Sequence, residues 1–139
     1  MEIYFGPKST SFWLAFLIGL GLIALGVNGI LQPEAASRAF GLAIVNPLDA
    51  GFVRVKADRD LVTGLAVILF SLLRMRKALS VFLCVGAAMP LIDGILVLTH
   101  GGRLQDCWQH FITMIFVLLV SYLLYRNSNT GIVRKEVKS

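Results

Sequence analysis

Four stretches of the chain consist almost entirely of apolar residues, and short polar segments separate them. They are residues 11–31, 60–73 with its flanks, 78–99 and 107–125. Each approaches the roughly 20 residues that an α-helix needs to cross the hydrocarbon of a bilayer. The second stretch is the shortest, and we expect its helix to begin around Lys56. The pattern predicts an all-α integral membrane protein with four spans.

The connections favour an up-down-up-down four-helix bundle. Residues 74–76 are all that separate the second stretch from the third, and the loop 100–106 is nearly as short. The one long connection, 32–58, opens with Gln32-Pro33-Glu34, which is typical of a helix start. We expect a short interfacial helix there, ended by Gly41. The chain thus reads as a single membrane domain over 1–126, followed by a basic, disordered tail over 127–139.

Two further features concern helix packing and helix shape. The first stretch is rich in small residues, several of them four apart, and such spacing lets membrane helices approach closely. These residues are Ser11, Ala15, Gly19, Gly21, Gly26 and Gly29. In the third stretch, Pro90 lacks the N–H that a helix interior needs. We expect it to bend that helix one turn before Asp93.

Composition and charge agree with a membrane location. The chain is 57% hydrophobic and 15% charged, with a mean hydropathy of +0.79, whereas soluble domains carry about 25% charged residues. The side of the termini and the 74–77 loop holds eight basic residues, against five on the other side. This bias predicts cytoplasmic termini, in the endoplasmic reticulum membrane if the cell is eukaryotic. Topology and anionic lipid account for the net charge of +5, so no nucleic-acid partner is expected.

The cysteines and the motif search narrow the chemistry. Cys84 lies within the third stretch and Cys107 opens the fourth near the opposite face, too far apart for a disulfide. We expect two free thiols, no metal site and no cofactor. The motifs HExxH, GxSxG, GxGxxG and the P-loop are all missing from the sequence. Metal-dependent proteolysis, serine hydrolysis and nucleotide use therefore have no support.

Asp93 is the most informative residue, because a carboxylate inside an apolar span costs about 2.5–3.5 kcal/mol on insertion scales. Helical rise places the other intramembrane polar groups in the same half of the bundle, next to the 32–58 connection. We predict a pocket open to that side, with catalytic residues Asp60, Asp93, Arg59 and His110. The predicted substrate contacts are Asn28, Thr63, Met89 and Trp108.

Each of these residues also has a purely structural interpretation. Asp93 is then a brace, neutralised by Arg59 or hydrogen-bonded to His110, and Asp60 is an acid favoured by the helix dipole. Arg59 would reach lipid phosphates. His110 and Trp108 would be interfacial residues, and Asn28 would form an interhelical hydrogen bond. The clustering of these groups at one end favours the functional interpretation.

Two segments resemble a known family. The order Gln32-Pro33-Glu34 through Phe40-Gly41, followed by Arg59-Asp60-Leu61-Val62-Thr63-Gly64-Leu65, is similar to the small four-helix membrane proteins grouped around DoxX. Some similar proteins accompany fungal natural-product pathways, where they are proposed to open or cyclise epoxides. The resemblance implies that Arg59 and Asp60 are site residues, and it carries no motif for Asp93 or His110.

The sequence supports three hypotheses on function. The leading one is a cofactor-free membrane enzyme that acts on a lipophilic small molecule by acid/base catalysis, through epoxide hydrolysis or epoxide-opening cyclisation. The second is a proton-coupled transport or channel component in which Asp93 and His110 relay protons. The third is a non-catalytic subunit or assembly factor. Membrane lipids are expected partners in each case, and homo-oligomerisation is left open.

Overall fold

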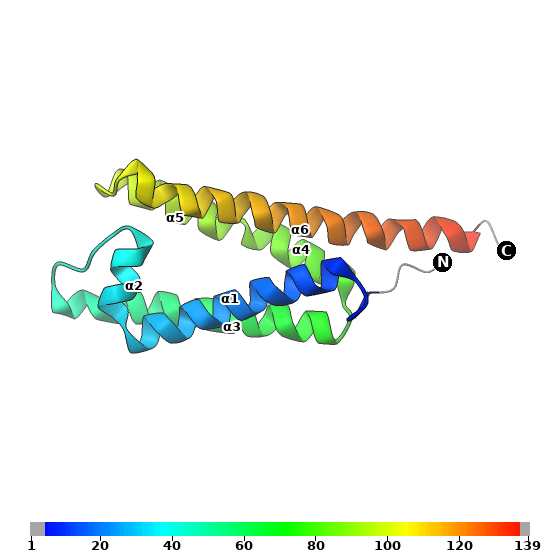
Figure 1. Ribbon diagram of the computed structural model, residues 1–139, viewed down its shortest axis with the longest axis horizontal. Coiled ribbons are helices and arrows are strands. Elements are labelled where there is room, and N and C mark those ends of the chain that lie inside the picture. The colour runs from blue at the N-terminus through cyan, green and yellow to red at the C-terminus, as the bar shows by residue number, and fades with distance from the viewer. Residues whose placement is uncertain (1–4, 137–139) are drawn as a thin grey trace.

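A computed structural model of the chain describes the backbone of residues 5–136 and the side chains of residues 5–126. These residues form helices and no strand. In chain order the elements are α1 (Thr10–Leu31), α2 (Pro33–Phe40), the 3-10 turn η1 (Pro47–Asp49), α3 (Ala50–Leu72), α4 (Arg76–Gly86), α5 (Ala88–Thr99) and α6 (Leu104–Glu136) (Figure 1). The prediction of an all-α protein is confirmed.

Three helical segments are long and apolar enough to cross a membrane. They are Thr10–Leu31, Arg76–Thr99 (α4 with α5) and Leu104–Arg126, the first part of α6. They indicate a membrane protein. Helix α3 has the necessary length, but its first part carries Arg54, Lys56, Asp58, Arg59 and Asp60. Helix α3 thus differs from the three apolar segments in its charged residues and not in its length.

The long helices are arranged as two antiparallel pairs. Helix α1 packs along α3, and α4 and α5 pack along α6, so most tertiary contacts fall within these pairs. Figure 1 shows the pairs meeting near the start of α1 and diverging toward the end where α2 lies. The backbones of the two pairs therefore lie close together at one end and farther apart at the other.

The seam between α1 and α3 depends on glycines. A Cβ on Gly26 would lie 2.7 Å from the Ala57 carbonyl oxygen and from the Leu61 backbone nitrogen. A Cβ on Gly64 would lie 2.6 Å from the Gly19 carbonyl oxygen. These distances leave no room for a side chain, so the helix backbones touch. The close approach expected from the small residues is confirmed, except at Gly21, which is exposed and where an added Cβ would meet no atom within 4 Å.

The third apolar stretch is interrupted where a bend was expected. Helix α4 ends at Gly86 and α5 begins at Ala88, two residues before Pro90. A proline clashes with the carbonyl four residues earlier, which here belongs to Gly86. The break allows α5 to leave the line of α4 while both stay against α6.

The apolar core lies where the two pairs meet. Every long helix except α5 contributes buried residues, as do Phe5 and Ala87, and several are fully inaccessible. The cluster consists of Phe5, Phe12, Ala15, Val67, Leu79, Leu83, Ala87, Val117, Val120 and Leu124. Ser80 of α4 and Ser121 of α6 support it, because each hydroxyl donates to the other residue's carbonyl at 2.8 Å. We call this half of the molecule the core end.

The opposite half is organised by α2 and its loop. Gly41 ends α2 in the left-handed conformation, with φ of 102°, which glycine adopts most readily. The Ser37 hydroxyl accepts a hydrogen bond from the Ile44 backbone nitrogen and turns the chain back over the helix. The expected short helix ended by Gly41 is confirmed.

Two boundaries differ from expectation. Helix α3 begins at Ala50, within the predicted connection, because Asn46 and Pro47 start η1 and the helix continues directly from it. At the other end, α6 runs on through 127–136, where we expected a disordered tail. Extending a helix that is already formed costs much less than starting one. Residues 137–139 of the predicted tail lie outside the described residues.

Candidate functional site

The site centres on Lys56, whose ammonium lies between two carboxylates. Its Nζ is 3.0 Å from Oδ2 of Asp60 on the same helix and 3.6 Å from Oδ2 of Asp93 on α5. The Nζ also lies 5.0 Å from the centre of the Phe40 ring at the end of α2. One side chain of α3 thus touches α2 and the other helix pair. We call the half of the molecule around it the polar end.

Helical spacing and one glycine produce this meeting. Lys56 and Asp60 are four residues apart, so they share a face of α3. On α5, Gly94 is buried against α6, and a Cβ there would lie 3.0 Å from the Phe111 ring. Asp93 is turned by about 100° from its neighbour Gly94. When Gly94 faces α6, Asp93 is therefore free to face Lys56.

The two carboxyl side chains are sheltered, although neither is fully buried. Their exposed fractions are 17% for Asp60 and 25% for Asp93, against 40% for Lys56. His110 is a further charged or polar group within electrostatic reach of Asp93. With both carboxylates ionised, the two acids outnumber the one ammonium. A proton held on one of the two carboxyl groups would balance the cluster.

Helix α2 is docked by side chains of α6. Nε2 of His110 lies 2.9 Å from the Phe40 carbonyl oxygen, and Nε2 of Gln109 donates to the Ala39 carbonyl at 2.8 Å. The carbonyls in the last turn of a helix have no partner within the helix, so these side chains cap α2. The Phe40 and His110 rings also meet edge to face, with centres 4.8 Å apart. Phe40 therefore links the cap to Lys56.

The loop between α5 and α6 carries a separate ion pair. Nε of Arg103 donates to Oδ2 of Asp106 at 3.1 Å, and this hydrogen bond raises the pKa of the Arg103 guanidinium. Asp106 lies in the first turn of α6, four residues before His110. Its partner is Arg103, so it stays outside the Lys56 cluster.

The structure brings three of the predicted catalytic residues together and leaves one apart. Asp60, Asp93 and His110 lie at the polar end as expected. Arg59 is exposed, and the cation between the carboxylates is Lys56. Arg59 is rotated by about 100° from Asp60, so the face of α3 that presents Asp60 inward turns Arg59 outward.

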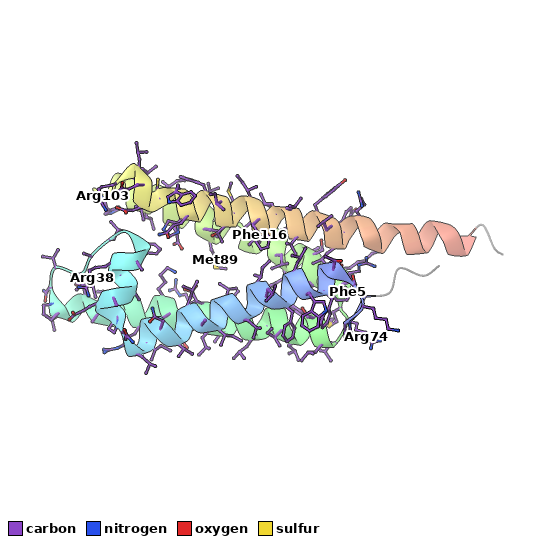
Figure 2. The ribbon with its side chains drawn as sticks, viewed as in Figure 1. Phe5, Arg38, Arg74, Met89, Arg103 and Phe116 are labelled. Atoms are coloured by element: carbon purple, nitrogen blue, oxygen red, sulfur yellow. The ribbon has the colours of Figure 1, made fainter. Side chains whose placement is uncertain are left out.

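The predicted substrate contacts are less concentrated. Met89 stands in the first turn of α5, is 41% exposed, and points between the two helix pairs (Figure 2). Thr63 is half-buried on α3. Asn28 is exposed on α1, and Trp108 is 60% exposed on α6. Of these four residues, Met89 is the one whose placement between the pairs fits a substrate contact.

Sequence reasoning missed Lys56, Phe40 and Gln109. The spacing of Lys56 and Asp60 was a usable signal, because such pairs meet on one helix face. For Phe40 and Gln109 the sequence held no comparable signal, because their partners are some 70 residues away along the chain.

Other reactive groups do not form a metal site. Among the described residues, no three His, Cys, Asp or Glu side chains are placed to hold a metal ion. Cys84 is exposed and Cys107 is buried, and both are free thiols. The carboxyl and ammonium groups of the Lys56 cluster are of the kind that transfer protons and stabilise charge.

Comparison with known proteins places the chain in a family. Residues 19–124 match the family model described as domain of unknown function DUF4267. The chain belongs to this family. The match spans every element from within α1 into α6, so Phe40, Lys56, Asp60, Asp93 and His110 all lie in the DUF4267 region. No curated protein and no solved structure matches the chain.

Proposed function

We propose that this DUF4267 member is a cofactor-free membrane enzyme that acts on a lipophilic small molecule by acid/base catalysis. The observation that carries the proposal is the convergence of Asp60 and Asp93, from different helix pairs, on the single ammonium of Lys56. Ionisable groups within apolar helices are costly and mark functional sites by default. Two carboxyl groups held near one cation suit paired proton donation and proton removal.

In this proposal α3 is the fourth span of an up-down-up-down bundle. Its second part, residues 61–72, is apolar, and Val62, Leu65 and Leu69 are more than half exposed. Such side chains are suited to contact lipid. The charges of the first part gather at the polar end, where Lys56 and Asp60 pair with each other. The basic bias of the opposite side supports cytoplasmic termini.

The specific reaction that we propose is opening of an epoxide. Asp60 makes the shorter contact with Lys56, so we assign it the ionised role and Asp93 the protonated role. Asp60 takes a proton from water while the water oxygen bonds to a ring carbon. The carbon–oxygen bond of the ring breaks, and its oxygen takes the proton of Asp93 to give a vicinal diol. A proton then passes from Asp60 to Asp93 through Lys56 or water, which resets the site.

The neighbours have supporting roles in this scheme. Met89 offers a flexible apolar contact between the helix pairs, suited to a lipophilic substrate. Nε2 of His110 is already engaged with the Phe40 carbonyl oxygen. We therefore assign His110 the role of holding α2 over the site. A substrate hydroxyl in place of water would make the same step a cyclisation.

Transport is the weaker proposal. A proton path through the molecule would need polar groups in the core end, and Val67, Leu79, Val120 and Leu124 there are all 0% exposed. Ser80 and Ser121 of that end hydrogen-bond each other, and the buried Ser71 donates to the Val67 carbonyl of its own helix. These features favour a site that is closed at its base.

The test replaces each carboxylate separately in the host cell. We expect Asp60→Asn and Asp93→Asn each to lower one lipophilic product by about 100-fold or more, because general acid–base groups contribute roughly 10²–10⁴ in rate. Untargeted metabolite profiling measures the change. Asp58→Asn is the matched control, because Asp58 is an exposed acid of the same helix. If both site variants remain folded and no metabolite changes, the enzymatic proposal fails.

A further inference from the structure

A groove at the core end lies apart from the Lys56 site. It runs between the end of α3 and the start of α4 and has a volume of about 560 Å³. Its lining residues are Phe70, Lys77, Ala78, Val81, Phe82 and Val85. The groove is shallow, so a ligand lying in it would be covered on one side only. The groove is open on one side, and none of its residues takes part in the proposed chemistry.

The apolar part of the groove is a narrow strip of surface that runs along α4, and we call it the track. Lys77, Val81 and Val85 are spaced by four residues, so they follow one face of the helix over about 12 Å. Val81 is 60% exposed and Val85 is 70% exposed. The floor of the groove is formed by the Phe70 and Phe82 rings, which meet edge to face with their centres 5.5 Å apart. Both rings pack against the apolar core. An extended hydrocarbon chain fits such a track.

The charge of the groove lies at one end of the track. Of the described residues that line it, Lys77 is the one with a charged side chain, and it stands in the first turn of α4. The preceding turn is Arg74-Met75-Arg76, so basic residues and no acid surround the mouth. Arg76 is also the first residue of an apolar segment long enough to span a membrane. Lys77 is thus placed at the level of lipid head groups.

We propose that this groove binds an anionic phospholipid. One acyl chain lies along Val81 and Val85 against Phe82, and the phosphate pairs with Lys77. The exposed valines favour hydrocarbon over water, because they lie within a membrane-spanning segment. Lys77, the charged residue that lines the groove, favours a lipid with net negative charge, since a basic residue near the membrane surface attracts anionic lipid.

The test measures lipid binding to the full chain. Native mass spectrometry of the protein in mild detergent compares phosphatidylglycerol with phosphatidylcholine at equal concentration. We expect a preference of roughly fivefold for phosphatidylglycerol, the value of one basic residue near lipid. Lys77→Gln should remove the preference, and Val81→Trp should reduce binding of both lipids by filling the track. Lys8→Gln, at another exposed basic residue of the core end, should keep the preference.

Two results would overturn the lipid site. One is equal binding of both lipids by the unchanged protein. The other is an equal loss of preference in Lys8→Gln and Lys77→Gln, which would show a general effect of positive charge. Asp93→Asn should bind lipid like the unchanged protein, because Asp93 belongs to the polar end. Failure of the enzymatic proposal therefore leaves the lipid site standing.

Discussion

The core end and the polar end are held together in different ways. At the core end, both helix pairs contribute apolar side chains, and Leu79, Val67, Val120 and Leu124 are completely inaccessible. At the polar end, polar side chains link the pairs, with Lys56 reaching Asp93 and α2 held by His110 and Gln109. Dense apolar packing holds the pairs together at one end, whereas hydrogen bonds and an ion pair connect them at the other.

The difference follows from two local features of the sequence. The break at Ala87 lets α5 change direction after α4 has packed into the core. Helix α2 then fills the polar end between the pairs and supplies Phe40 (Figure 1). In the proposed enzyme, a lipophilic substrate would enter where the helix pairs lie farther apart, and the apolar core would hold the same helices in place. In this molecule the two regions are separated along the same helices.

The largest expected effect is at the core end. Leu79→Ala should destabilise the protein by about 2–5 kcal/mol, because removing a fully buried side chain leaves a cavity. Unfolding in detergent with increasing denaturant measures the loss. Leu69→Ala is the matched control, since Leu69 is 54% exposed and should change stability little. Equal losses in the two variants would contradict the assignment of the core to this end.

An intermediate effect is expected from the cation of the polar end. Lys56→Met leaves Asp60 and Asp93 facing each other without a positive partner, which should cost about 1–3 kcal/mol. Adding Asp93→Asn to Lys56→Met should restore most of that stability. Arg103→Gln removes a more exposed ion pair at the same end and should have no detectable effect. If Asp93→Asn fails to rescue, Lys56 does not stabilise the protein through this carboxylate.

The smallest effect should be local to α2. His110→Ala removes the hydrogen bond to the Phe40 carbonyl and should cost about 0.5–1.5 kcal/mol. The more telling measurement is amide hydrogen exchange, which should speed up in α2 and stay unchanged at the core end. His100→Ala, at an exposed histidine in the loop before α6, serves as control. Unchanged exchange in α2 would mean that other contacts hold it.

Much of the fold could be predicted from the pattern of apolar residues. The helices of the first, third and fourth stretches begin and end within a few residues of expectation, apart from the extension of α6. The short helix before Gly41 and the disruption near Pro90 were also predictable, because glycine and proline impose local constraints. The wide separation of the helix pairs at the polar end was not, because it depends on how α2 and α5 pack.

The sequence by itself determined the depth of each polar group. A fixed rise along each helix places Asp60, Asp93 and His110 at one end, and the structure agrees. Only the tertiary structure decided which face of each helix turns inward. Packing of Gly26 of α1 against α3, of Gly64 of α3 against α1, and of Gly94 of α5 against α6 sets those rotations. They bring Lys56, and not Arg59, between the two carboxylates. The depth of a residue depends only on its position along its own helix, whereas the direction in which its side chain points depends on how two helices pack.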